Sequence, residues 1–335
     1  MKNILHFICL LAAFTASGQE KRVLVVSGGG ARGAWGAAVA TALLKNERPD
    51  YRAIYSTSTG SLMAPLIALN DTMKLRIAYT NTTQKDIFNK NPFKDDGRIR
   101  MLPAVLKIIF GKKNLGETHN LKKVITSFFT SSDFDRLKAT GRSVNVSTVS
   151  LTSGELAYKS TDSFGYTDMV DWVWASANQP VFMTTVHKDG GQWVDGGVKE
   201  NVPIREAVLY AKKHDIKTID VIVNNKEGDR NIEWPAPKQK GNIVGKLLRV
   251  IDLFSDEIRT SDIIAGALSA QIDSVTINIY YMPVADFNLC PHSLLFKPPI
   301  LKTLWDHGSA FLEPGIFKKA SVEKTVNGII FRTFQ

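Results

Sequence analysis

The sequence predicts an α/β fold in which helices cover both faces of a mostly parallel central sheet. From residue 21 onward, short runs rich in β-branched residues alternate with amphipathic runs of helical length, as is typical of such a sheet. Of the 335 residues, 44% are hydrophobic and 22% are charged. This composition supports a large core and excludes coiled-coil, collagen-like and disordered chains.

The elements follow from these runs in chain order. The β-branched runs predict strands at residues 23–26, 53–56, 143–148, 154–159 and 218–223. Amphipathic periodicity predicts the helices that separate them, at residues 36–45, 61–70, 121–129, 168–177 and 204–213.

The remaining third of the chain begins with a charged, proline-containing linker at residues 226–241. A long amphipathic helix at about residues 242–271, a strand at 275–281 and a helix at 300–311 follow the linker. One strand cannot build a core of its own. We therefore expect residues 242–335 to complete the sheet of residues 21–225, so that residues 19–335 form one domain.

Residues 1–18 have the organisation of a secretory signal peptide. Lys2 precedes an apolar run at residues 4–16, and the small residues Ser17 and Gly18 end it. The run is shorter than the roughly 20 apolar residues that cross a bilayer. The alternative is a buried core helix. We expect export, to a periplasm, an outer surface or the medium.

The charge balance favours an anionic partner. Lys and Arg number 42 against 32 Asp and Glu, which gives a net charge of +10. Such a charge suits a membrane surface or a nucleic acid. Two cysteines exclude a disulfide-stapled scaffold, and no pair of histidines has the spacing of metal ligands, so we expect no metal site.

A glycine-rich loop lies between the first predicted strand and the next helix. Its glycines are Gly28, Gly29, Gly30 and Gly33. Without side chains, their N–H groups can converge on a phosphate or on the oxyanion of an acyl-transfer intermediate. Three of them also fit the dinucleotide pattern G-x-G-x-x-G. That pattern needs an acidic residue at the end of the second strand, whereas Asp50 precedes it.

The second predicted strand leads into a serine-rich turn and a helix. The nucleophile-elbow pattern G-x-S-x-G holds at Ser58 and Gly60, with Ser56 in place of its first glycine. A serine at such a turn is exposed above the N-terminus of the next helix. The alternative is a polar turn that caps the helix.

A third motif is Asp195-Gly196-Gly197. Asp-Gly-Gly alone is typical of a tight turn in which the Asp caps its own backbone. A serine hydroxyl is a weak nucleophile until a neighbouring group accepts its proton. A carboxylate placed against Ser58 would supply that base.

In this order, GGGARG, STSTG and DGG resemble the motifs of the patatin-like phospholipase family. Further similarity covers nearly all of residues 21–335, notably at residues 91–93, 141–158, 175–180, 195–204 and 304–308. The resemblance implies the family's three-layer sandwich. It also implies hydrolysis of lipid carboxylic esters, phospholipids included, through an acyl-enzyme and without a metal or cofactor.

The resemblance also assigns roles to residues. Ser58 would be the nucleophile and Asp195 its base, forming a dyad in place of a triad. The oxyanion hole would come from Gly28, Gly29 and Gly30, and Arg32 and Gly33 would hold the loop. The supporting positions of the two turns would be Ser56, Gly60, Gly196 and Gly197.

Two alternatives remain open. Because Ser56 departs from the family pattern, the chain could be an inactive lipid-binding protein on the same scaffold. An α/β-hydrolase triad would add His292 or His307 to Ser58 and Asp195. That fold normally places strands before its elbow, whereas this elbow lies close to the chain start.

Residues 98–113 contain five cations and no acidic residue around an apolar run of helical length. Such a segment can lie in a membrane interface, where anionic lipid attracts its cations. It predicts peripheral membrane contact, as a lid or docking surface; the alternative is a helix packed on the core. No nucleic-acid-binding motif is present, so we expect no nucleic-acid partner. The sequence leaves the oligomeric state open.

Overall fold

A computed structural model describes residues 19–227, 243–312, 321–326 and 329–334. The predicted signal peptide and most of the predicted linker lie outside the described residues, so export stays a prediction. The described helices include none that is both long enough and apolar enough to cross a membrane.

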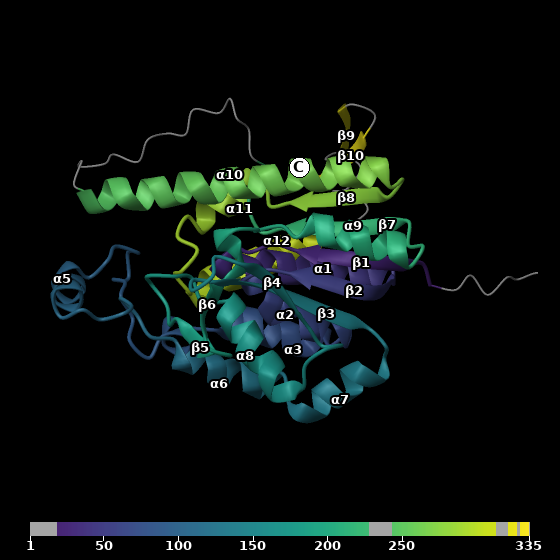
Figure 1. The fold of residues 1–335 in the computed structure, drawn as a ribbon. Coiled ribbons are helices and arrows are strands. Elements are labelled where there is room, and N and C mark those ends of the chain that lie inside the picture. Colours follow the sequence, from purple (N-terminus) through teal and green to yellow (C-terminus); the bar gives the residue numbers. More distant parts are fainter. Residues whose placement is uncertain (1–18, 228–242, 313–320, 327–328, 335) are drawn as a thin grey trace, which may run out of the picture.

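Within the described residues, one sheet of ten strands organises the molecule (Figure 1). Its order is β5-β6-β3-β2-β1-β7-β8-β10-β9, and β4 pairs with β3. The strands are β1 (Lys21–Val26), β2 (Asp50–Ser56), β3 (Ser143–Ser150), β4 (Leu156–Ser160), β5 (Val186–Lys188), β6 (Gly191–Asp195), β7 (Thr218–Val223), β8 (Thr276–Tyr281), β9 (Ser321–Val326) and β10 (Ile329–Phe334).

The middle of the sheet is parallel, from β3 through β2, β1, β7 and β8 to β10. Antiparallel pairs occur toward its margins, where β4, β5, β6 and β9 join. The predicted α/β class with a mostly parallel sheet is therefore confirmed. Of the antiparallel strands, β4 was predicted, whereas β5, β6 and β9 were not. Only short loops connect β3 to β4 and β5 to β6, which allows these neighbours to pair without a crossover helix.

Helices cover both faces of the sheet (Figure 1). The bounds are α1 (Gly33–Asn46), α2 (Thr59–Ala68), α3 (Thr72–Asn81), α4 (Gln84–Ile87), α5 (Met101–Ile109), α6 (His119–Phe128), α7 (Ser131–Ala139), α8 (Tyr166–Ser176), α9 (Ile204–Lys213), α10 (Ile243–Ile272), α11 (Val284–Leu289) and α12 (Pro298–Ala310).

The alternation of side chains along β1 divides the core into two. Leu24 and Val26 belong to the larger cluster, with residues of α1, α2, α8 and α12. Val23 and Val25 belong to the other cluster, with residues of α9 and α10. Because successive strand residues point to opposite faces, a strand buried on both faces is apolar throughout. The sheet is thus the middle layer of a three-layer sandwich.

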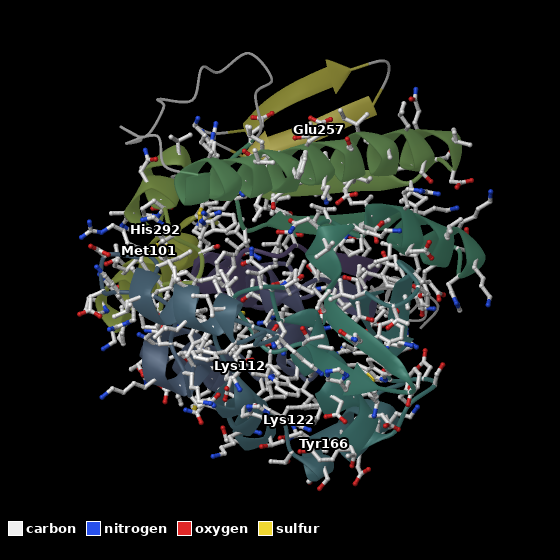
Figure 2. The ribbon with its side chains drawn as sticks, turned by 60° about the vertical axis from the view of Figure 1, so that its left-hand side comes forward. Met101, Lys112, Lys122, Tyr166, Glu257 and His292 are labelled. Carbon is white, nitrogen blue, oxygen red and sulfur yellow. The ribbon has the colours of Figure 1, made fainter. Side chains whose placement is uncertain are left out.

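Helix α5 lies apart from these layers. Figure 1 shows it projecting from the end of the molecule toward which the parallel strands run, the end that carries the loops after β1 and β2. Figure 2 shows its first residue, Met101, on the same side of the molecule as His292.

Candidate active site

The glycine-rich loop follows β1 and leads through a short 3₁₀ turn into α1. The Gly28 N–H donates to the Asn201 carbonyl at 3.2 Å, and the Ala31 N–H donates to the Ser293 carbonyl at 2.7 Å. Among the described residues, no acceptor is bonded to the N–H groups of Gly29 and Gly30. Two main-chain donors are therefore open here, whereas the sequence predicted three.

Gly30 adopts a backbone conformation that favours glycine. Its φ is +57°, a left-handed conformation that favours residues without a Cβ. A Cβ there would also lie 2.1 Å from the Ser293 carbonyl oxygen. The segment that contains Ser293 therefore packs directly on the loop, which fixes how its amides point.

Arg32 fastens the loop to the same segment. Its buried guanidinium donates to the carbonyls of Cys290 at 3.0 Å and Pro291 at 3.1 Å. It also lies 4.3 Å from the centre of the Phe287 ring. Burial lowers the pKa of Arg32 to about 10, so the side chain still carries its charge at neutral pH.

Ser58 occupies the tight turn between β2 and α2. Its φ of 55° and ψ of −123° are unusual for a residue with a side chain and fit the strained elbow that the sequence predicted. Its N–H donates to the Ser176 hydroxyl at 3.1 Å. At Gly60 a Cβ would lie 2.4 Å from the Val26 carbonyl oxygen, so glycine lets α2 pass close to β1.

The elbow accommodates the Ser56 side chain, because its hydroxyl is hydrogen-bonded there. The side chain is buried, and its Oγ donates to the Asn145 carbonyl at 3.1 Å and lies 3.3 Å from the Ser61 Oγ. Burying a hydroxyl group costs little folding free energy when the group is hydrogen-bonded. The departure from the family's glycine is thus accommodated by β3 and α2.

Asp195 ends β6 and is held rigidly there. It pairs with Thr148 of β3, and its N–H donates to the Asn178 carbonyl at 3.0 Å. Its Oδ1 accepts the Gly197 N–H at 2.8 Å. A Cβ at Gly196 would lie 2.0 Å from the Ser147 Oγ, so this turn sits flat against β3.

The carboxyl group of Asp195 faces Ser58. Burial raises its pKa to about 6, although the neighbouring Ser58 hydroxyl and the Gly197 N–H act in the opposite direction. The structure therefore brings together the two side chains that the sequence singled out. They lie beside the Gly28 end of the glycine loop, since a Cβ on Gly28 would be 3.2 Å from the Ser58 Cβ.

Sequence reasoning missed two residues that hold this arrangement. The Asn201 carbonyl accepts the Gly28 N–H, and Asp262 of α10 accepts the N–H groups of Asn201 at 2.6 Å and Val202 at 3.0 Å. The pattern Asn-Val-Pro shortly after Asp195 was a local signal for Asn201. No local signal links Asp262 to a turn 60 residues before it.

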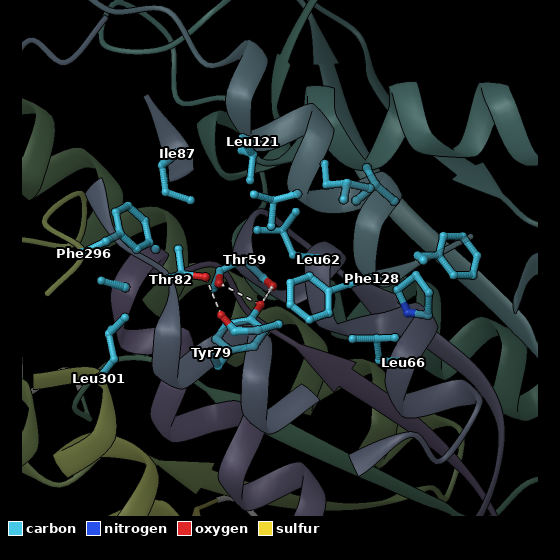
Figure 3. Close-up of a pocket in the computed structure, with 18 residues that line it drawn as sticks. Thr59, Leu62, Leu66, Tyr79, Thr82, Ile87, Leu121, Phe128, Phe296 and Leu301 are labelled. Atoms are coloured by element: carbon cyan, nitrogen blue, oxygen red, sulfur yellow. Dashed lines mark hydrogen bonds between the residues drawn. The ribbon is translucent and has the colours of Figure 1, made fainter. Parts of the chain in front are cut away.

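An apolar cavity lies next to the glycine loop and the first residue of α2 (Figure 3). Gly30 and Thr59 line one side of it, and the Tyr79 hydroxyl donates to the Thr59 carbonyl at 2.6 Å. The rest of the wall comes mainly from hydrocarbon side chains, including Leu62, Leu66, Leu121, Ile125, Phe128 and Phe296. The cavity therefore suits a hydrocarbon group rather than a charged one.

The histidines of the alternative triad lie elsewhere. The Nδ1 atom of His307 lies 2.5 Å from the Oδ1 atom of Asp286. His292 packs against Gly97, where a Cβ would lie 2.7 Å from the imidazole ring. Within the part of the chain that the structure describes, no histidine hydrogen-bonds Ser58 or Asp195.

The fold, with an elbow after β2 and a glycine loop after β1, defines the class of protein. A family model described as patatin-like phospholipase matches residues 24–208, which is more than half of the chain. The chain belongs to the patatin-like phospholipase family, as its motifs predicted.

Among solved structures, the chain is similar to VipD from Legionella pneumophila, with 14% identity and a TM-score of 0.41. The similarity covers 69% of this chain and 53% of that chain, so this protein spans about half the length of VipD. A search of curated proteins finds no match.

Proposed function

We propose that the chain is a lipid acyl hydrolase that cleaves carboxylic esters through an acyl-enzyme on Ser58. The observation that carries the proposal is the position of the Ser58 side chain next to the buried Asp195 carboxyl group, whose pKa Ser58 lowers. Membership in the patatin-like phospholipase family supports the same chemistry.

In the first half of the reaction, Ser58 Oγ attacks the ester carbonyl while its proton passes to Asp195. The carbonyl oxygen becomes an oxyanion beside the open N–H groups of Gly29 and Gly30. By comparison with other acyl-transfer enzymes, each such donor contributes about 3–4 kcal/mol to transition-state stabilisation. Collapse of the intermediate breaks the ester C–O bond, and the leaving alcohol takes the proton from Asp195.

In the second half, a water molecule replaces the alcohol. Asp195 removes a proton from the water as its oxygen attacks the acyl carbon, and the same two N–H groups bind the second oxyanion. Collapse releases the carboxylic acid, and Ser58 regains its proton from Asp195. A carboxylate with a pKa of about 6 is ionised at neutral pH and accepts a proton more readily than an exposed Asp does.

The cavity supports a lipid substrate. It begins at Gly30, an expected oxyanion donor, and at Thr59, the residue after the nucleophile. A hydrocarbon chain bound there would leave its carbonyl carbon near Ser58. Burial of apolar surface contributes roughly 0.8 kcal/mol for each methylene, which favours long acyl groups.

A covalent fluorophosphonate probe tests the proposal directly. We expect labelling at Ser58 in the wild-type protein, none in Ser58→Ala, and a loss of at least about 10³-fold in ester turnover in Asp195→Asn. Thermal melting of both variants should match the wild type. A folded protein that the probe does not label would instead be a lipid-binding protein on the same scaffold.

Two further variants distinguish the dyad mechanism from the triad mechanism. We expect His292→Ala and His307→Ala to retain turnover within a few-fold. Loss of a triad histidine costs on the order of 10⁴-fold or more, so a loss of that size in either folded variant would overturn the dyad.

A further inference from the structure

Helix α5 presents its apolar side chains to solvent. Leu102, Ile108, Ile109 and the following Phe110 are each 69–73% exposed, and Met101, Val105 and Leu106 are also exposed. In a helix that packs on a core, these side chains would be buried. The core-packed alternative for residues 98–113 is therefore not what the structure contains.

The face of α5 that points toward the body is the less apolar one. Ala104 is the one buried residue of the helix, and the Lys107 ammonium group donates to the Leu115 carbonyl at 2.6 Å. Leu102, Val105, Leu106 and Ile109 recur at intervals of three and four residues, so they share the opposite face. The helix is amphipathic, with its apolar face turned outward.

Cations flank this helix at both ends. Arg100 precedes the helix, and the exposed Lys112 and Lys113 follow Phe110. Arg98 is exposed as well and pairs with Asp96 at 2.6 Å. An outward apolar helix with basic flanks matches a lipid surface that is negatively charged, because acyl chains take the apolar face and headgroups take the cations.

The helix is connected to the active site by short contacts. Arg100 donates to the Phe93 carbonyl at 2.9 Å, and Gly97, a few residues before the helix, packs on His292. The next residue, Ser293, accepts the Ala31 N–H of the glycine loop. A surface bound by α5 would thus lie at the end of the molecule where Ser58 is found.

We propose that α5 and its basic flanks dock the protein on membranes that contain anionic lipid. This inference rests on the proposed function, since a hydrolase of membrane lipids must reach the bilayer. Docking on the membrane involves binding only and no covalent chemistry. It accounts for a cluster of exposed hydrocarbon that a protein surface rarely presents without a partner.

The test is co-sedimentation with phosphatidylcholine vesicles that contain about 30% phosphatidylglycerol, with inactive Ser58→Ala protein so that no lipid is hydrolysed. We expect binding that falls at least about tenfold in Leu102→Ser/Ile109→Ser. Lys112→Gln/Lys113→Gln should weaken it by roughly fivefold for each charge, and pure phosphatidylcholine should bind more weakly.

A matched control removes two equally exposed apolar side chains elsewhere. Met73 on α3 is 74% exposed and Ile272 at the end of α10 is 82% exposed. Met73→Ser/Ile272→Ser should bind vesicles as the parent does. Turnover of a soluble short-chain ester by Leu102→Ser/Ile109→Ser, with Ser58 intact, checks that the fold is preserved.

The outcomes separate this proposal from the function. Vesicle binding that is absent, or equal in all variants, overturns docking through α5, whatever the probe does at Ser58. Sedimentation equilibrium tests whether a second copy of the chain covers the helix instead. That would be shown by a dimer that dissociates in Leu102→Ser/Ile109→Ser while vesicle binding is unchanged. If the probe does not label Ser58 but the protein still binds vesicles, the proposed hydrolase is overturned and the proposed docking surface stands.

Discussion

Asp195 determines how activity should depend on pH. Its pKa is raised to about 6 by burial, and the base must be ionised to accept the proton of Ser58. Turnover should therefore be constant above about pH 7 and fall tenfold per unit below about pH 6. The measurement is kcat/KM for a soluble ester between pH 4.5 and 8.

A control distinguishes Asp195 from a second buried carboxyl group. Burial also raises the pKa of Asp262 to about 6. Asp262→Asn should lower the rate yet keep the same midpoint. A profile that stays flat down to pH 5, or a midpoint that moves in Asp262→Asn, would contradict the assignment.

Glu200 should make the fold less stable at high pH. Burial and the nearby charges of Asp262 and Glu206 raise its pKa to about 8. Between its ordinary value of 4.5 and about 8, the folded protein binds a proton that the unfolded chain has released. The free energy of unfolding therefore falls as pH rises through this window.

Glu200→Gln tests this effect, because the amide stays neutral at every pH. We expect the variant to exceed the wild type in stability by roughly 1–3 kcal/mol at pH 8.5 and to match it near pH 4.5. Urea unfolding at both pH values measures the difference. If the two proteins differ in free energy of unfolding by the same amount at both pH values, the charge of Glu200 does not affect stability.

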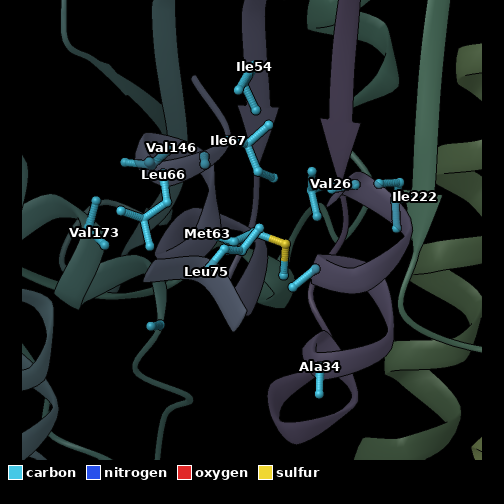
Figure 4. Close-up of a cluster of buried hydrophobic side chains, with 14 of the residues drawn as sticks. Val26, Ala34, Ile54, Met63, Leu66, Ile67, Leu75, Val146, Val173 and Ile222 are labelled. Carbon is cyan, nitrogen blue, oxygen red and sulfur yellow. The ribbon is translucent and has the colours of Figure 1, made fainter. Parts of the chain in front are cut away.

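At the scale of elements, α2 should be sensitive to added volume. Its side chains Met63, Leu66 and Ile67 pack into the larger core (Figure 4), and Gly60 brings its first turn against the Val26 carbonyl. In Gly60→Ala the helix must shift, because a Cβ at 2.4 Å from a backbone oxygen is not tolerated. We expect a loss of roughly 2–4 kcal/mol in stability and at least tenfold slower probe labelling.

Gly165 offers a matched control for Gly60. It has an ordinary φ of −80° before α8, and a Cβ there would meet nothing within 4 Å. Gly165→Ala should keep both stability and labelling. Equal effects of the two substitutions would show that the close approach of α2 to β1 is unimportant.

Elements with a strong local pattern were predictable from sequence. β1 contains the apolar run Val23–Val26, β2 contains the shorter apolar run Ala53–Tyr55, and the loop and elbow after them carry glycine and serine patterns. β5 spans three residues, too short for any alternation to appear. Helix α7 was not predicted, although Thr130 and Asp133 form a capping box at its start that gave a usable signal.

Contacts between distant segments were not predictable in the same way. The Ser293 carbonyl, which accepts the Ala31 N–H of the glycine loop, has no local sequence signal. Asp262 reaches the site only because α10 packs on the face that also holds α9. Which glycine amides stay open depends on these contacts, so the sequence predicted Gly29 and Gly30 but could not show that the Gly28 N–H is bonded to Asn201.

At the scale of the whole molecule, the C-terminal third is part of the core. β8 pairs with β7 in parallel, and α12 packs on α1 so closely that a Cβ at Gly308 would lie 2.5 Å from the Trp35 carbonyl oxygen. The Phe311 ring meets the Trp35 ring edge-on at 5.3 Å. The match to the family model ends at residue 208, before either β7 or β8.

A chain that ends after residue 226 should therefore fail to fold. It would leave β7 as an unpaired edge and expose Trp35 and the apolar side of α9, surfaces that favour aggregation. We expect residues 19–226 to lack a cooperative thermal transition and to elute as aggregates, whereas residues 19–335 melt cooperatively in parallel measurements by circular dichroism. A soluble shorter chain that melts cooperatively and reacts with the probe at Ser58 would mean that the glycine loop needs neither α10 nor the Ser293 segment to hold its shape.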